Sequence, residues 1–411
     1  MAGPPTICVP LPATETTLAW LALALTPGLG PRRIQRAVRG MGEPAELFRL
    51  PLTALEALQI PVASARFIAE GKARKAAEEE WQRICDSGCG VMTVADADYP
   101  ERLREIFDPP AVLWVRGDRA LLSRPAIAVV GTRAPSPYGI GMAEMLSRDL
   151  AARRMVILSG MARGVDTAAH KGALNAGGRT VAVWGTGLDV VYPKENKRLA
   201  EEIVLSGGAI VSEQPMGTFP APQNFPLRNR IISGMSVGVL VVEAGEQSGT
   251  RVTARCALEQ NRDVYAVPGN VTSRNAWGPN TLIKQGARLT ATWEDIWEEL
   301  PTQIRLELEG RVGVPEAGQE ELFAASAASR EGVTASLLPP SNAALPAGLP
   351  LSGPETAVYG MLRMDEALHL EELLEKLEGQ VTSAELFTAL FELELNNHIR
   401  QLPGKNYVRR M

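Results

Sequence analysis

The sequence predicts an α/β protein with a doubly wound, mostly parallel sheet at its centre. Between residues 124 and 293, segments of helical periodicity alternate with six short runs rich in β-branched residues, at 127–131, 155–159, 180–184, 209–212, 237–242 and 263–267. These runs are apolar throughout, which is typical of strands whose two faces are both covered. The helical segments that separate or follow them are 137–153, 166–176, 194–206, 228–234 and 250–261. Strands and helices in this alternation form a parallel sheet with helices on both faces.

A small helical domain is expected before the sheet, over residues 1–85. Apolar residues recur there at three- and four-residue spacing, and proline and glycine separate the periodic segments. The sheet domain is then expected over residues 86–300. A chain of 411 residues is too long for one ordinary core, so several domains are expected.

Two further segments follow the sheet. Residues 301–353 are rich in Ala, Pro, Gly, Ser and Glu and have no periodic apolar pattern, so we expect a flexible linker. Residues 354–411 regain periodicity as three amphipathic helices and a hairpin-like end at Pro403-Gly404. This order is similar to a winged helix. Because the segment is acidic, a protein-contact module is at least as well supported as a DNA reader.

The composition indicates a soluble globular protein without a metal site. No apolar run approaches the length of a membrane span, and the N-terminus lacks the basic and apolar regions of a secretory signal. A cytoplasmic location is therefore expected. Cys8, Cys85, Cys89 and Cys256, with only three histidines, are too dispersed for a zinc site. We expect neither a metal nor a cofactor.

Charge is distributed unevenly along the chain. The net charge is −5, yet residues 124–293 hold 19 Lys and Arg against 12 Asp and Glu. Residues 301–411 hold 9 basic against 16 acidic residues. A basic middle and an acidic tail suit a negatively charged partner at the sheet, although chance variation along a long chain also gives excesses of this size.

The turns after three of the predicted strands carry the residue types of an anion-binding loop. The first holds Gly131-Thr132-Arg133, the second Ser159-Gly160 with Arg163, and the third Ser248-Gly249-Thr250. A glycine at a strand end lets backbone N–H groups turn toward an anion at the start of the next helix. Parallel strands bring such turns to one edge of the sheet, where open α/β sheets bind ligands. None of these turns matches the GxxxxGK[ST] or GxGxxG phosphate motifs, so tight nucleotide binding is not indicated.

A fourth motif joins an aromatic residue to two cations. Phe225 precedes Arg228, Asn229 and Arg230. This combination suits single-stranded nucleic acid, because a ring offers a stacking face while arginines meet phosphates. From the residues alone, Phe225 is equally well explained as a buried plug in a proline-rich loop.

Catalytic arrangements are not indicated. His170 and Lys171 lack an orienting partner in the sequence and are better explained as packing or solvated residues. No nucleophile motif appears.

Six ordered motifs over about residues 95–290 resemble the DNA-processing protein family DprA, also called Smf. They are VGTRAPSPYG, LSGMARGVDTAAHKGAL, TVAVWGTGLDVVYPKENKRL, SEQPMGTFPAPQNFPLRNRIISGMS, EAGEQSGTRVTARCALEQNRDVYAVPGN and GPNTLIKQGA. The resemblance implies an extended Rossmann-like domain that binds and protects single-stranded DNA, forms homodimers and loads the RecA recombinase during natural transformation. Single-strand-binding protein is a further implied partner.

The resemblance also implies roles for particular residues. Arg133 and Lys194 would meet phosphates, and Phe225 would stack on a base. Arg228, Asn229 and Arg230 would line the same groove, while Ser159-Gly160 and Ser248-Gly249 would supply backbone donors. The flanks fit more loosely. The turn at 25–31 is similar to a helix-hairpin-helix turn, though a plain turn between helices explains it as well, and residues 354–411 look like the winged-helix-like domain of some members.

Two alternatives remain open from the sequence. A related α/β family, the LOG-type nucleotide phosphoribohydrolases, uses a PGGxGTxxE motif with a catalytic carboxylate. Thr253 stands where that glutamate would be, so the carboxylate that would act as acid or nucleophile in hydrolysis is missing. We therefore predict a binding protein rather than an enzyme. The second alternative, a protein-interaction adaptor, predicts no salt-sensitive DNA binding.

Overall fold

The computed structural model describes residues 13–246, 248–310 and parts of 353–409. It divides into one compact unit up to residue 317 and a second unit from residue 318. Most of the predicted linker, residues 311–352, lies outside the described residues. In the described part, no helix combines the length and apolar character needed to cross a membrane.

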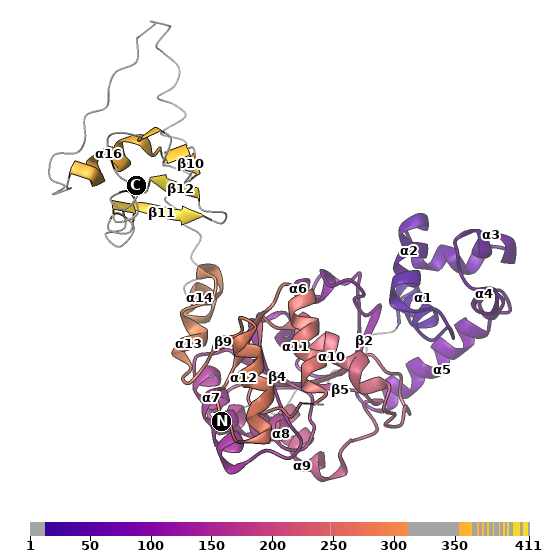
Figure 1. Cartoon of the computed structure of the whole chain (residues 1–411). Helices are drawn as coiled ribbons and strands as arrows, with labels where there is room; N and C mark the ends of the chain where they lie inside the picture. The colour runs from indigo at the N-terminus through magenta and orange to yellow at the C-terminus, as the bar shows by residue number, and fades with distance from the viewer. Residues whose placement is uncertain are drawn as a thin grey trace, which may run out of the picture. The chain divides into compact units, whose positions relative to one another are not determined.

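The first unit begins with a group of short helices, drawn in indigo and purple in Figure 1. Thr14 caps the first of them by accepting a hydrogen bond from the backbone N–H of Thr17. Pro31 begins the second, directly after Gly30, as proline does in a first helical turn. The elements are α1 (Glu15–Ala24), α2 (Pro31–Met41), the 3₁₀ helix η1 (Pro44–Arg49), α3 (Leu52–Ala57), α4 (Val62–Ala69) and α5 (Lys72–Asp86).

The predicted α/β class is confirmed by a nine-stranded sheet of order β1-β2-β6-β5-β4-β3-β7-β8-β9. The six predicted strands form its centre and run parallel to one another. At one edge, β2 runs antiparallel to both of its neighbours. The strands are β1 (Gly90–Thr93), β2 (Val112–Gly117), β3 (Ala126–Val130), β4 (Val156–Ser159), β5 (Thr180–Trp184), β6 (Ala209–Ser212), β7 (Gly238–Val241), β8 (Asp263–Ala266) and β9 (Arg288–Leu289).

Alternate residues of the central strands enter different cores. In β3, Ile127 and Val129 pack with one group of helices, while Ala128 and Val130 pack with the other. In the view of Figure 1, α7 and α8 lie below the sheet and α10 and α11 above it. The helices of this region are α6 (Glu101–Arg104), α7 (Pro137–Ala152), α8 (Val165–Asn175), α9 (Lys197–Leu205), α10 (Asn224–Met235), α11 (Thr250–Glu259), α12 (Trp277–Lys284), α13 (Glu294–Trp297) and α14 (Thr302–Leu308). The same region contains the 3₁₀ turns η2 (Arg119–Ser123), η3 (Lys194–Asn196) and η4 (Arg274–Ala276).

The beginning of the predicted linker is helical instead. Residues 302–308 form α14, and its Ile304 and Leu308 join the core beside α7. Their three- to four-residue spacing is an apolar signal too short to stand out in an Ala- and Pro-rich segment.

The helical group and the sheet share one hydrophobic core. Trp20 and Leu23 of α1 belong to the same cluster as Trp114 and Trp184 of the sheet. The buried carboxylate of Glu80 adds a polar connection, since its Oε1 accepts hydrogen bonds from Trp114 Nε1 at 2.8 Å and from the Met216 backbone N–H at 2.7 Å.

The second unit contains α16 (Gly353–Met361), β10 (Leu368–His369), β11 (Ile399–Leu402) and β12 (Asn406–Arg409). The strands form an antiparallel sheet of order β10-β12-β11. Leu402 pairs with Asn406, so β11 and β12 are antiparallel as a hairpin requires, and the predicted turn at 403–404 lies outside the described residues. Much of the second and third predicted helices lies outside the described residues.

Candidate nucleic-acid interface

The strand order reverses beside β3, which places the turn after β3 next to the turn after β7. The chain runs outward from β3 through β4, β5 and β6, and then returns to place β7 on the other side of β3. The two turns are joined directly, since the Thr132 backbone N–H donates to the Glu243 carbonyl at 2.7 Å. Ligands of open α/β sheets bind at such a switch point.

A groove of about 810 Å³ opens at this point. Nine of the residues expected in a DNA site line it: Gly131, Thr132, Arg133, Phe225, Arg228, Asn229, Ser248, Gly249 and Thr250. A smaller adjoining recess is lined by Gly160 and Arg163 and shares Arg133, Phe225 and Arg228 with the groove. The turns after three strands therefore converge, as the sequence predicts.

Close packing explains two glycines of these turns. A Cβ atom on Gly131 would lie 2.5 Å from Val165 Cγ2, so this position admits no side chain. Gly164 has a φ of +78°, and a Cβ there would lie 2.5 Å from the Thr132 carbonyl oxygen. Both glycines let the turn after β4 press against the turn after β3.

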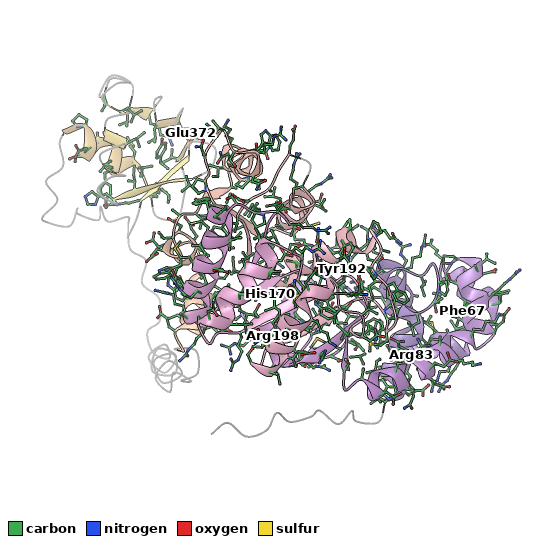
Figure 2. All side chains as sticks on the ribbon, turned by 90° about the horizontal axis from the view of Figure 1, so that it is seen from below. Phe67, Arg83, His170, Tyr192, Arg198 and Glu372 are labelled. Carbon is green, nitrogen blue, oxygen red and sulfur yellow. The ribbon has the colours of Figure 1, made fainter. Side chains whose placement is uncertain are left out.

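Three side chains form a cluster at the groove wall, in which two aromatic rings are tilted by 41° to each other. The Phe225 ring lies in the first turn of α10, half-buried, and its centroid is 5.5 Å from that of Tyr192. The exposed Arg133 guanidinium lies on the same ring, with Cζ 5.6 Å from the centroid. Figure 2 labels Tyr192 on the α/β part of the molecule. The half-buried Phe225 ring thus lines the groove next to a cation, an arrangement that suits base stacking.

Arg228 forms the floor of the recess. Its side chain is buried, and Nη1 donates to the carbonyl oxygens of Gly160 and Val183, both at 2.5 Å. Burial lowers the pKa of Arg228 to about 10. The charge of Asp166 acts in the opposite direction and raises this pKa. Arg228 therefore ties the ends of β4 and β5 to α10.

Asp166 occupies the backbone donors of the turn after β4. Its Oδ2 accepts hydrogen bonds from the backbone N–H groups of Gly160 at 3.1 Å and Ala162 at 3.2 Å. Burial raises the pKa of Asp166, while Arg228 and these two donors act in the opposite direction. The buried Asp166 carboxyl thus takes the place that an anion would have at these two backbone N–H groups.

Glu243 lines a neighbouring cavity and contacts the groove residue Asn275. Its carboxylate accepts hydrogen bonds from the Ser136 backbone N–H at 2.8 Å, from Ser136 Oγ at 2.5 Å and from Asn275 Nδ2 at 3.3 Å. Ser136 also caps α7 by accepting from the Gly139 N–H. The carboxylate holds the start of α7 in place.

Comparison with known proteins decides the family. A family model described as DNA recombination-mediator protein A matches residues 90–301. The chain belongs to the DprA/Smf family. A second model, the DprA winged helix domain, matches residues 341–405.

Individual relatives agree with this assignment. Protein Smf of Escherichia coli is 39% identical over 328 residues, covering 77% of this chain and 76% of that protein. The DNA processing protein DprA of Bacillus subtilis is 43% identical over 217 residues, covering 53% of this chain and 73% of that protein. Among solved structures, DNA processing protein A from Streptococcus pneumoniae superposes with a TM-score of 0.62 at 34% identity, covering 71% of this chain and 99% of that chain.

One arginine of the DprA motif lies outside the groove, contrary to expectation. Arg230 is buried and donates to both carboxylate oxygens of Glu213 at 2.5 and 2.6 Å, and it lies 3.3 Å from Asp108. Successive residues of a helix point about 100° apart, so 228, 229 and 230 cannot all face one groove. The sequence prediction starts this helix at residue 228, whereas α10 begins at Asn224.

The turn after β4 also differs from expectation. Ser159 is buried, and its hydroxyl donates to the Val129 carbonyl at 2.6 Å instead of facing the groove. The Gly160 N–H is bound to Asp166, so the Ser159-Gly160 pair offers no free backbone donor to a ligand. Arg163 is exposed and pairs with Glu195 at 2.6 Å. Lys194 is exposed beside the recess residue Pro193 but does not line the recess itself.

Three residues of the site, Tyr192, Glu243 and Asn275, were not among those predicted from the sequence. Tyr192 stands inside the YPKEN segment after β5, so its place at a strand end was an available signal. Nothing in the sequence indicates that Asn275 contacts Glu243, because they come from different loops.

Thr253, the residue at the position of the LOG-type glutamate, is buried at the groove. Within the described residues, no cluster of three or more His, Cys, Asp or Glu is placed to hold a metal ion.

Proposed function

We propose that this chain binds single-stranded DNA in the groove at the switch point. The observation that carries the proposal is the cluster of Arg133, Phe225 and Tyr192 at the groove wall. An aromatic ring that lines the groove beside a guanidinium offers both a stacking surface for an unpaired base and a charge for the adjoining phosphate. The bases of duplex DNA are already paired and stacked on each other, so they are not free to stack on Phe225. Single strands are therefore expected to be preferred.

Membership of a recombination-mediator family supports the next step. We propose that the bound strand is protected and then passed to the RecA recombinase during natural transformation, in the cytoplasm, by a homodimer. Single-strand-binding protein is a further partner in this scheme, since it competes for the same strand.

The protein acts by binding and carries out no reaction in this proposal. The carboxylate that lines the groove, Asp166, accepts hydrogen bonds from two backbone N–H groups, and that of Glu243, in a neighbouring cavity, accepts from Ser136 and Asn275. Incubation with nucleoside monophosphates tests this point, and release of free base at enzyme-like turnover would establish the LOG-type alternative instead.

The binding test uses fluorescence anisotropy with labelled oligothymidine at two salt concentrations. Affinity is expected to exceed that for a duplex of equal length and to fall with salt, because phosphate contacts release counterions. A salt-independent signal, or none with the full chain, would contradict the proposal. RecA filament formation on strands covered with single-strand-binding protein, with and without this chain, tests the loading step separately.

A further inference from the structure

Phe107 is an aromatic residue that the fold does not bury. It lies between α6 and β2, and 78% of its surface is exposed. The guanidinium of Arg32, at the start of α2, lies over its ring. The pair repeats, at a second place, the chemistry of Arg133 on Phe225.

The helix that carries Arg32 presents an uncompensated positive face. Arg32, Arg33, Arg36 and Arg39 are all exposed on α2. Arg33 donates to the Gly28 carbonyl and Arg36 to Gln59 Oε1, and within residues 13–246 and 248–310 none of the four pairs with a carboxylate. Four exposed arginines on an eleven-residue helix, none of them paired with a carboxylate in this part of the chain, favour a polyanion.

This surface adjoins the groove across the first turns of α10. Pro226 and Asn229 line the groove, while Leu227 and Arg230 line a cavity of about 290 Å³ on the other side of the helix. The same cavity is lined by Pro31 and Asp108, the chain neighbours of Arg32 and Phe107.

Leu227 is the step between the two surfaces. It is 51% exposed, so its side chain offers an apolar contact to a strand that leaves the groove over it. The two carboxylates of the cavity, Asp108 and Glu213, are both bound to Arg230, which offsets their repulsion of phosphates.

We propose that Phe107, Arg32 and the arginine face of α2 bind the continuation of the same single strand beyond the groove. A base stacks on the open face of the Phe107 ring, and the α2 arginines meet the following phosphates. This inference rests on the proposed function and adds a second contact region, contributed by the helical part of the chain.

The test compares oligothymidines of two lengths on the full chain. A single binding fold covers roughly 4–16 nucleotides, so one probe of about 6 and one of about 30 separate the groove from its extension. For Phe107→Ala combined with Arg32→Gln, affinity for the long probe is expected to fall roughly five- to hundredfold, with unchanged affinity for the short probe. The salt slope is the decrease in the logarithm of the binding constant with the logarithm of the salt concentration. For the long probe it is expected to fall by about 0.7 for each phosphate that the variant no longer neutralises.

Matched controls keep the outcomes distinct. Phe219→Ala combined with Arg66→Gln removes an equally exposed ring and an exposed arginine elsewhere, and is expected to leave both probes unaffected. A second variant, Arg36→Glu combined with Arg39→Glu, reverses charge without touching Phe107 and is expected to weaken the long probe alone. Thermal melting verifies that the variants are folded.

One outcome is that both variants bind the long probe as tightly as the unmodified chain, while Phe225→Ala still lowers the affinity for the short probe. In that case the second contact region is wrong and the groove remains the binding site. If the unmodified chain binds neither probe, the proposed function itself fails. Loss of self-association without loss of long-probe affinity would show that this face contacts protein, and would also overturn the inference.

Discussion

The Cζ atom of Arg133 lies 5.6 Å from the centroid of the Phe225 ring. Arg133 follows β3 and Phe225 lies in the first turn of α10, so the contact joins two elements that line the groove. It places a stacking surface and a positive charge side by side. Separate substitutions can therefore remove the stacking and the charge one at a time.

Phe225→Ala is expected to weaken binding of oligothymidine by about 1–3 kcal/mol, because one base loses its stacking surface. Phe225→Trp is expected to retain most of the affinity. Anisotropy titration measures both. Phe219→Ala serves as the control, since Phe219 is 75% exposed and does not line the groove. Equal affinities for Phe225→Ala and the unmodified chain would exclude Phe225 as a stacking residue.

Arg133→Gln is expected to weaken binding for every sequence and to lower the salt slope by about 0.7, the value for one phosphate on a single strand. With a short oligothymidine that occupies the groove alone, Arg230→Gln is expected to leave the slope unchanged, since Arg230 is bound to Glu213 and Asp108 outside the groove. Anisotropy at several salt concentrations gives both slopes. A reduced slope for Arg230→Gln alone would mean that the groove has been placed on the wrong side of α10.

Arg228→Met is expected to lower the free energy of unfolding by about 3–5 kcal/mol, because Asp166 would lose its buried charge partner. The carbonyl oxygens of Gly160 and Val183 lose their donor as well. Asn229→Ala, at the neighbouring half-buried position, is expected to change stability by less than about 1 kcal/mol. Urea denaturation measures the difference, and similar midpoints for the two variants would show that Arg228 is not a structural tie.

His170 is expected to make stability depend on pH. Its ring is buried, its Nδ1 lies 2.7 Å from Thr180 Oγ1, and burial lowers its pKa from 6.5 to about 3. Figure 2 labels it within the α/β part. The folded state therefore binds fewer protons than the unfolded state between these values. Its contribution to stability is complete above pH 6.5 and falls with decreasing pH, by up to about 1.4 kcal/mol per pH unit.

The matching variant is His170→Gln, which keeps a polar group at Thr180 but does not titrate in this range. Urea denaturation at pH 7 and pH 5 is expected to show a smaller loss for the variant than for the unmodified chain. An identical pH dependence in both proteins would contradict a buried neutral imidazole.

The central strands were predictable because each is a continuous apolar run, and the turns that follow them could be placed at one edge by topology alone. The edge strands β1 and β9, and β2 next to β1, were missed. For β1 and β2 the reason lies in their sequences. Val91 and Val112 sit in short segments with charged and proline neighbours, where no alternation with helices marks them as strands. Their position depends on packing against α5 and β6, which sequence periodicity does not contain.

Within the site, residue types were easier to predict than directions. Arg133 and Phe225 follow or precede clear elements, so their place at the groove could be expected. Arg230 could not, because its direction depends on where α10 begins, and the NFP segment reads as a loop. The occupied Gly160 N–H was equally hidden, since it depends on which way the Asp166 carboxylate turns.

The bond from Glu80 to Trp114 and Met216 bears on how this protein would tolerate dissection. Cutting between α5 and β1, at a boundary that looks clean in the sequence, would expose an indole N–H and a main-chain amide that now share one acceptor. It would also remove Trp20 and Leu23 of α1 from the hydrophobic cluster that contains Trp184. We expect the helical group and the sheet to unfold as one unit. An isolated sheet fragment would therefore be less stable than the same sheet in the full chain.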